Sequence, residues 1–248
     1  VVAGRLSVQA GAHHMEIHQG GNGTLLGGVP GVPAAQVLVL GGGVVGTNAI
    51  RMALGMGADV TVIDRSVKRL TELDEQYGGR LRTVYSTTDA IEQCARHADL
   101  IIGAVLIPGA SAPKLITRSL LQKLKPGAVM VDVAIDQGGC FETSTPTTHA
   151  DPTYVIDQIV HYCVANMPGA VARTATMALT NATLPYIQRL AQGNLDTLLR
   201  DDPHFANGLN IRAGKITHPA VAEALAKVAT QQSATSLSDS SHTMGHAA

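Results

Sequence analysis

The sequence predicts an α/β fold in which an open, doubly wound parallel sheet lies between two layers of helices. Short runs of aliphatic residues alternate with stretches of helical periodicity, as in repeated strand–helix–strand units. The runs are apolar at successive positions, as in QVLVL at 36–40, which is typical of strands buried on both faces. Glycine is abundant, with 26 residues, whereas aromatic residues make up only 3%, so the core must be aliphatic.

Start and stop signals delimit the predicted elements. Apolar residues spaced by three and four from Val45 to Met56 predict a helix that Gly57 ends. Ser66 is a suitable N-cap for the next helix, and Gly78 ends it. The predicted elements, in chain order, are strand 36–40, helix 45–56, strand 59–64, helix 67–77, strand 82–85, helix 89–97, strand 100–105, helix 117–124, strand 128–133, a long loop 136–152 and strand 160–165. With right-handed crossovers, the six strands predict the sheet order 3-2-1-4-5-6.

The six-strand unit comprises residues 31–170. The segments on either side of it are predicted to belong to a second domain. Residues 1–30 contain a predicted helix, 7–18, and a glycine-rich connector. Residues 171–230 are predicted to be helical, above all over 174–192. We therefore expect both flanks to belong to a second, incompletely represented domain. The polar, low-complexity tail 231–248 is predicted to be disordered.

Composition and charge exclude several classes of partner. The 18 Lys and Arg residues nearly balance 19 Asp and Glu, so a basic surface for nucleic acid is not expected. The longest apolar runs are about five residues, whereas ~20 are needed to span a bilayer, so a membrane partner is not expected either. The three cysteines lack a CxxC pair, which favours a reducing, cytoplasmic location. The histidines show no spacing that predicts a metal site.

The first predicted strand–helix turn reads LGGGVVG and places Gly41, Gly43 and Gly46 in G-x-G-x-x-G spacing. In this motif Gly41 permits a tight turn, Gly43 lets the backbone approach a pyrophosphate, and Gly46 lets the helix pack closely on the strand. The helix N-terminus offers unpaired N–H groups to the anion. The motif therefore predicts a dinucleotide site in a Rossmann-type domain.

Asp64 ends the second predicted strand, eighteen residues past Gly46, where a carboxylate can accept both ribose hydroxyls of an adenosine. The same carboxylate would repel a 2′-phosphate, which favours NAD over NADP, although the neighbouring Arg65 weakens this preference. The alternative is that Asp64 only caps a surface turn.

Two loops at the carboxyl ends of later strands carry further candidates, since ligands of such sheets bind at that edge. Asp136 follows a strand and precedes two glycines, and its pattern fits a catalytic group and a loop cap equally well. Asn166 precedes a Pro-Gly turn. Cys140 is expected to be a small buried residue rather than a reactive thiol.

Over residues 1 to about 228 the sequence resembles alanine dehydrogenase, and its most specific elements are DQGGCFE with PTTH, and HYCVANMPG. The segments that carry the resemblance are VLVLGGGVVGTNA, IIGAVLIPGASAPKLIT, VMVDVAIDQGGCFETSTPTTH, VHYCVANMPGAVARTAT and ALTNATLPYIQRLA. The resemblance implies reversible conversion of L-alanine, NAD and water to pyruvate, ammonium and NADH.

The resemblance also implies roles for individual positions. Asp64 matches the ribose-binding carboxylate, and Asp136 also matches a residue that takes part in proton transfer. Cofactor contacts are implied for Arg69 and Ser86, for Val105 and Leu106 on the adenine side, and for Val133, Ala134, Ile135, Asp136, Val164, Ala165, Asn166 and Met167 on the nicotinamide side.

Members of that family carry an additional N-terminal segment that supplies the substrate-binding Arg and Lys and the acid/base His. None of these can be located here, and neither His13 nor His14 is a substitute for the last. We therefore expect a cofactor site and half an active site, with NAD binding but little turnover by this chain alone. The resemblance further implies a homo-oligomer, often a hexamer. Two alternatives remain: the NAD-binding component of a transhydrogenase, and a non-catalytic NAD-binding module.

Overall fold

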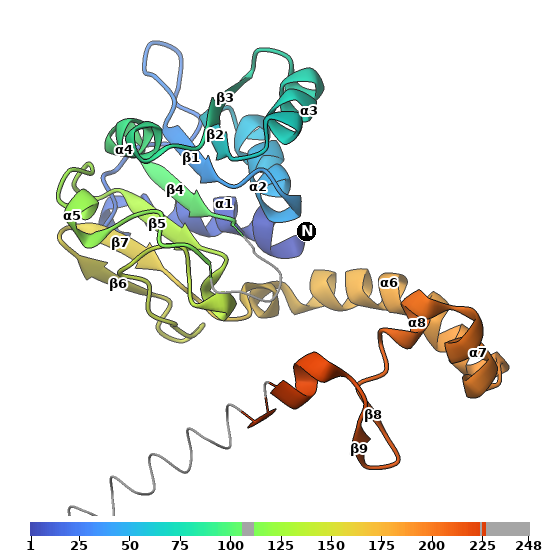
Figure 1. The fold of residues 1–248 in the computed structure, drawn as a ribbon. Coiled ribbons are helices and arrows are strands. Elements are labelled where there is room, and N and C mark those ends of the chain that lie inside the picture. The colour runs from blue at the N-terminus through green and yellow to red at the C-terminus, as the bar shows by residue number, and fades with distance from the viewer. Residues whose placement is uncertain (106–111, 224, 227–248) are drawn as a thin grey trace, which may run out of the picture. The chain divides into compact units, whose positions relative to one another are not determined.

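The computed structural model describes residues 1–105, 112–223 and 225–226 (Figure 1). The chain divides into two units, Val1–Met177 and Ala178–Ala248. The predicted disordered tail, 231–248, lies outside the described residues.

The first unit is built on a seven-stranded sheet of order β3-β2-β1-β4-β5-β7-β6. All neighbouring strands pair in parallel except β6 and β7, which pair antiparallel. The strands are β1 Gln36–Leu40, β2 Asp59–Asp64, β3 Leu81–Tyr85, β4 Leu100–Gly103, β5 Val129–Asp132, β6 Thr153–Ile156 and β7 Ile159–Tyr162. The predicted order of six parallel strands is confirmed, with β7 in the sixth position.

The additional strand, β6, is the main difference from the prediction. It forms a hairpin with β7 through the two-residue turn Asp157-Gln158, whose φ angles are 49° and 65°. Such a turn ordinarily uses Asn-Gly or Asp-Gly, because both central residues need positive φ. The sequence carries no glycine here and so gave no hairpin signal.

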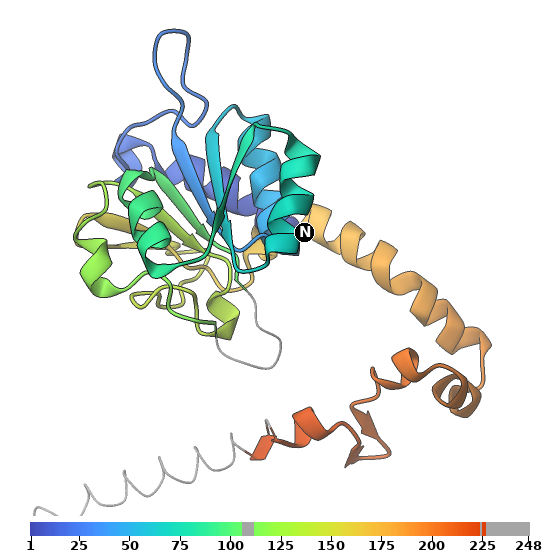
Figure 2. The same ribbon diagram turned by 45° about the horizontal axis from the view of Figure 1, so that its top comes forward.

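Helices cover both faces of the sheet (Figures 1 and 2). One apolar core packs α1, α2 and α3 against residues such as Val37 and Val39, and the other packs α4 and α5 against residues such as Leu38 and Leu40. The central strands β1, β4 and β5 are therefore buried on both faces, as expected. The helices are α1 Val2–His14, α2 Val44–Gly55, α3 Val67–Tyr77, α4 Thr88–His97 and α5 Arg118–Leu121.

Two helices differ from their predicted bounds by three residues or more at one end or both. The helix predicted over 117–124 is α-helical only from Arg118 to Leu121, because the following backbone N–H groups, of Lys123 and Leu124, bond three residues back in tighter turns. The helix predicted over 7–18 begins at Val2 and ends at His14, and a short 3₁₀ helix, η1 Ile17–Gln19, follows.

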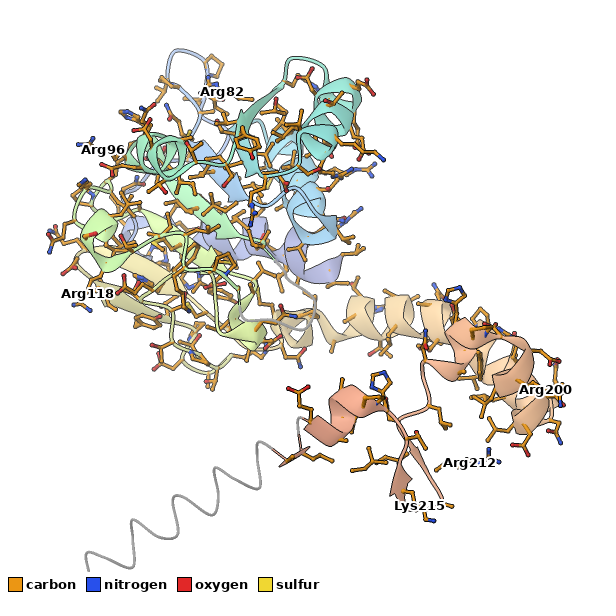
Figure 3. The ribbon with its side chains drawn as sticks, in the orientation of Figure 1. Arg82, Arg96, Arg118, Arg200, Arg212 and Lys215 are labelled. Carbon is orange, nitrogen blue, oxygen red and sulfur yellow. The ribbon has the colours of Figure 1, made fainter. Side chains whose placement is uncertain are left out.

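The second unit contains most of α6 Ala172–Gln192, then α7 Leu195–Asp201, α8 Pro203–Ala206 and the hairpin β8 Ile211–Arg212 and β9 Lys215–Ile216. Within it, Arg189 pairs with Asp202 (2.9 Å) and lies over the ring of Phe205. Arg212, visible on the hairpin in Figure 3, pairs with Asp196 at 2.6 Å. No residue of α6 is buried, and its exposed side chains include Leu179, Leu184, Tyr186, Ile187 and Leu190.

Candidate nucleotide-binding site

The glycine turn between β1 and α2 has the geometry its spacing predicts. Gly41 has φ 99°, in the region that favours glycine. A Cβ on Gly46 would lie 1.8 Å from the carbonyl oxygen of Gly41, so the helix sits as close to the turn as a glycine allows. Gly43 is the N-cap of α2, and a Cβ there would meet no atom within 4 Å. The helix therefore begins at an open backbone surface, and its first N–H groups have no acceptor within the helix.

Asp64 joins this turn to the end of β2. Its Oδ2 accepts a hydrogen bond from the Gly42 N–H at 2.7 Å, and its Oδ1 accepts one from the Ser66 N–H at 2.8 Å. The carboxylate thus caps a turn, as the alternative interpretation holds, and it also faces the cleft described below. Each carboxylate oxygen can accept more than one hydrogen bond, so acceptor capacity remains for a ligand.

Arg69 holds the same turn from the other side. Its Nε donates to the carbonyl oxygen of Gly42 at 2.7 Å, and its NH2 donates to the Thr47 hydroxyl at 2.6 Å. Its NH1 pairs with Glu72 at 2.7 Å. The peptide groups on both sides of Gly42 are therefore fixed by two side chains of the β2–α3 segment. Arg69 borders a depression beside the turn that Gly43 also lines.

A cleft of about 470 Å³ opens at the carboxyl edge of the sheet. Its size is within the range of small-molecule sites, and its wall is mostly aliphatic. Five predicted residues lie in that wall: Gly41, Gly43, Asp64, Ser86 and Val105. The remaining lining residues are Val44, Val45, Arg65, Ala104, Pro113 and Leu115. An open helix N-terminus, a carboxylate and mostly apolar walls fit the pyrophosphate, ribose and adenine of a dinucleotide.

The other predicted residues lie elsewhere. Val133 to Asp136 follow β5, and Val164 to Met167 follow β7, so both groups lie at the carboxyl edge of the sheet but outside the lining of this cleft. Asp136 is exposed, in the short helix η2 Ile135–Gln137. Leu106 lies outside the described residues.

Asn166 has a left-handed backbone, with φ 57°. Its carbonyl oxygen accepts a hydrogen bond from the Gly169 N–H at 2.9 Å and lies 3.1 Å from Nε2 of His149. A Cβ on Gly169 would lie only 3.0 Å from that ring nitrogen, so the glycine makes room for the histidine. Left-handed non-glycine residues persist where their surroundings fix them, often at functional sites.

Sequence reasoning missed Asp132, which is completely buried at the end of β5. Burial raises the pKa of its carboxyl group, and the Ser144 hydroxyl and nearby backbone N–H groups oppose that rise. A charged residue inside an apolar run, AVMVDVAI at 128–135, is the signal that could have identified it. Cys140 is buried, as expected, and burial raises the pKa of its thiol to about 12.

His161 is completely buried on β7. Its Nδ1 lies 3.0 Å from the carbonyl oxygen of Ile159, and its Nε2 lies 2.8 Å from the Thr143 hydroxyl. The ring stacks on Tyr154 at 5.0 Å. The neutral ring satisfies both contacts, because Nδ1–H donates to the carbonyl and Nε2 accepts from the hydroxyl. Burial lowers the pKa of His161 below its ordinary 6.5, although the Ile159 carbonyl and two carboxylates oppose the shift.

The contribution of His161 to the unfolding free energy is therefore expected to be constant at mildly alkaline pH and to fall as the pH drops below 6.5. In that window the unfolded chain takes up a proton at His161 that the folded chain does not. His14, whose pKa burial also lowers, contributes with the same sign. Urea unfolding at about pH 7.5 and about pH 5.5 measures the slope. A His161→Gln chain should show a smaller loss between the two values, and an equal loss would contradict this assignment.

Among the described residues, no helix is long and apolar enough to cross a membrane. Within the same part of the chain, no group of three or more His, Cys, Asp or Glu residues is arranged to hold a metal ion.

Comparison with known proteins links this geometry to a family. Residues 7–219 match the family described as "Alanine dehydrogenase/PNT, C-terminal domain". An alanine dehydrogenase of Halomonas elongata is 67% identical over 223 residues, which are 90% of this chain and 60% of that protein. One of Mycolicibacterium smegmatis is 53% identical over 224 residues, again 90% and 60%. The chain thus spans about 60% of the length of these curated relatives.

Solved structures were also found to be similar to this chain. A structure of L-alanine dehydrogenase is similar with a TM-score of 0.88 at 52% identity, over 91% of this chain and 62% of that one. A transhydrogenase of Sinorhizobium meliloti is similar with a TM-score of 0.73 at 22% identity, over 87% of this chain and 61% of that one. The second likeness concerns the fold alone.

Proposed function

Because the chain belongs to the alanine dehydrogenase/PNT C-terminal domain family, we propose that it forms the cofactor half of an NAD-dependent alanine dehydrogenase. The observation that supports this best is the pairing of an open helix N-terminus at Gly43 with the Asp64 carboxylate in one cleft. The first feature suits a pyrophosphate, and the second suits a ribose that carries no 2′-phosphate. The reaction proposed is the reversible oxidation of L-alanine to pyruvate and ammonium.

Each part of the cleft has a role in this proposal. The N–H groups at the start of α2 bind the pyrophosphate, and Asp64 accepts hydrogen bonds from the adenosine ribose. Val105 and Leu115 provide apolar walls that exclude water from the cofactor. NAD, when bound, supplies the hydride acceptor. We assign to Asp136, exposed after β5, a part in proton transfer near the reacting carbon.

We also propose that the exposed apolar side chains of α6 pack in a second domain, to which residues 171–230 contribute. The lack of any buried residue on this 21-residue helix supports that assignment. Residues 1–30, whose helix α1 packs in the core of the first unit, would connect that domain to the sheet. A cytoplasmic location and assembly into a homo-oligomer, as a hexamer, are part of the same proposal. The three free cysteines are consistent with a reducing compartment.

Calorimetric titration of this chain with NAD and NADP tests the cofactor assignment. We expect saturable binding of NAD and weaker binding of NADP, because the Asp64 carboxylate repels a 2′-phosphate. Equal affinities, or no binding of NAD, would contradict the assignment.

A second assay tests the reaction. A protein extended to the length of the relatives should oxidise NADH when pyruvate and ammonium are both present, whereas this chain alone should show little turnover. Binding of NAD without oxidation by the extended protein would favour a non-catalytic NAD-binding module instead.

A further inference from the structure

Asp132, the last residue of β5, has a completely buried carboxylate. A charge in that position must be compensated by hydrogen bonds or an ion pair. Its Oδ1 accepts from the N–H of Ala134 at 3.0 Å. Its Oδ2 accepts from the N–H groups of Cys140 (2.8 Å) and Phe141 (3.4 Å) and from the Ser144 hydroxyl (2.5 Å). Asp132 forms no ion pair with a described residue, so these four donors carry the compensation.

All four donors belong to the loop that follows β5, residues 133–144. Ala134 lies near its start and Ser144 at its end, so the single carboxylate draws both ends together. Gly139 permits this closure, because a Cβ there would lie 2.6 Å from Oδ2 of Asp132. On the outer side, Lys114 donates hydrogen bonds to the carbonyl oxygens of Gly138 and Gly139.

The same loop supports one wall of the cofactor cleft. The N–H of Leu115 donates to the carbonyl oxygen of Cys140 at 2.7 Å, and the N–H of Glu142 donates to that of Ile116 at 2.9 Å. These bonds fix the 112–116 segment, whose Pro113 and Leu115 line the cleft. The loop also contains Val133 to Asp136, the residues assigned to the nicotinamide side.

We infer that Asp132 is a positioning residue for the nicotinamide end of the cofactor, acting through the 133–144 loop that its carboxylate holds closed. The inference rests on the proposed function, since it assumes that this loop meets the nicotinamide. Asp132 itself contacts neither cofactor nor substrate in this role. Its largest effect falls on the placement of Asp136 and of the backbone around it, and the cleft wall at Leu115, which the loop supports through the Cys140 carbonyl, is affected less.

The experiment compares Asp132→Asn and Ser144→Ala with the unsubstituted chain in calorimetric titrations with NAD and with ADP-ribose, which lacks the nicotinamide. Asn keeps the shape of Asp but turns one acceptor into a donor that faces N–H groups. Ser144→Ala removes one hydrogen-bond donor and leaves the carboxylate in place, so it tests the same set of hydrogen bonds with a smaller change to the structure. Asp151→Asn is the matched control, because it makes the same chemical change in an exposed carboxylate seven residues past Ser144.

We expect the Kd for NAD to rise about tenfold in both variants and the Kd for ADP-ribose to rise less than about threefold, from the loss of bonds to a charged group. Amide hydrogen exchange of residues 138–141 should also become faster in both variants. Asp151→Asn should change none of these values.

The outcomes separate the inference from the proposed function. If the unsubstituted chain does not bind NAD more tightly than ADP-ribose, the nicotinamide assignment of the loop fails, and the inference fails with it. If the unsubstituted chain prefers NAD and both variants keep that preference, only the inference is overturned. An equal loss of affinity for the two ligands would show that Asp132 is structural and not a positioning residue. Should Asp132→Asn fail to fold, Ser144→Ala alone decides between these results.

Discussion

An Asp64→Asn chain is expected to bind NAD about 100-fold more weakly, because hydrogen bonds to a charged acceptor contribute about 1.5–3 kcal/mol each. The amide keeps a single acceptor, whereas the carboxylate already accepts from the N–H groups of Gly42 and Ser66 and must also accept from the ribose. Calorimetric titration with NAD measures the change. Asp59→Asn is the control, because Asp59 is an exposed carboxylate at the opposite end of the same strand.

The same substitution should reduce the difference in affinity between NAD and NADP. Without the negative charge a 2′-phosphate is no longer repelled, and the exposed Arg65 in the cleft wall can pair with it. The ratio of the two Kd values should therefore move towards one in Asp64→Asn and stay unchanged in Asp59→Asn. A full NAD preference in Asp64→Asn would show that the ribose is recognised by another group.

Periodicity and glycine spacing were sufficient to predict most of the sheet. Buried parallel strands are apolar on both faces, so their runs stand out, and short connections with a fixed crossover hand leave few possible orders. The antiparallel β6 could not be found in this way. Its residues are only partly buried, and its turn at Asp157-Gln158 lacks the glycine that marks such hairpins.

The candidate site, like the sheet, has features that the sequence predicts and features that it does not. Glycines and Asp64 could be predicted because each answers a local backbone requirement of the first strand–helix turn. The hydrogen bonds of Arg69 to the Gly42 carbonyl and the Thr47 hydroxyl could not be predicted, because they depend on two different elements packing side by side. Asp132 was missed for a related reason: its four donors lie up to twelve residues away, and no local pattern brings them together. Contacts between elements are decided by packing rather than by propensity.

Two Gly→Ala substitutions in the glycine turn, at Gly46 and at Gly43, are expected to affect folding and NAD binding separately. Gly46→Ala is expected to lower the free energy of unfolding by about 3 kcal/mol or more, because overpacking against backbone has no side chain that can yield. Its Cβ would lie 1.8 Å from the Gly41 carbonyl oxygen and 3.3 Å from Val39. Urea unfolding measures the change, and the helix α2 must move away from β1 for the variant to fold at all.

Gly43→Ala should instead weaken NAD binding and leave the stability of the fold unchanged. The new methyl group meets no protein atom within 4 Å and the residue keeps an ordinary φ of −67°, so the unfolding free energy should change by less than about 0.5 kcal/mol. It would nevertheless occupy the space into which the pyrophosphate must come, so the Kd for NAD should rise about tenfold or more. Gly55→Ala, at the exposed end of the same helix, also meets no atom within 4 Å and should change neither the affinity nor the fold adversely. If Gly43→Ala binds NAD as tightly as Gly55→Ala does, the start of α2 is not where the pyrophosphate binds, and the role of the open helix end in the proposed function must be given up.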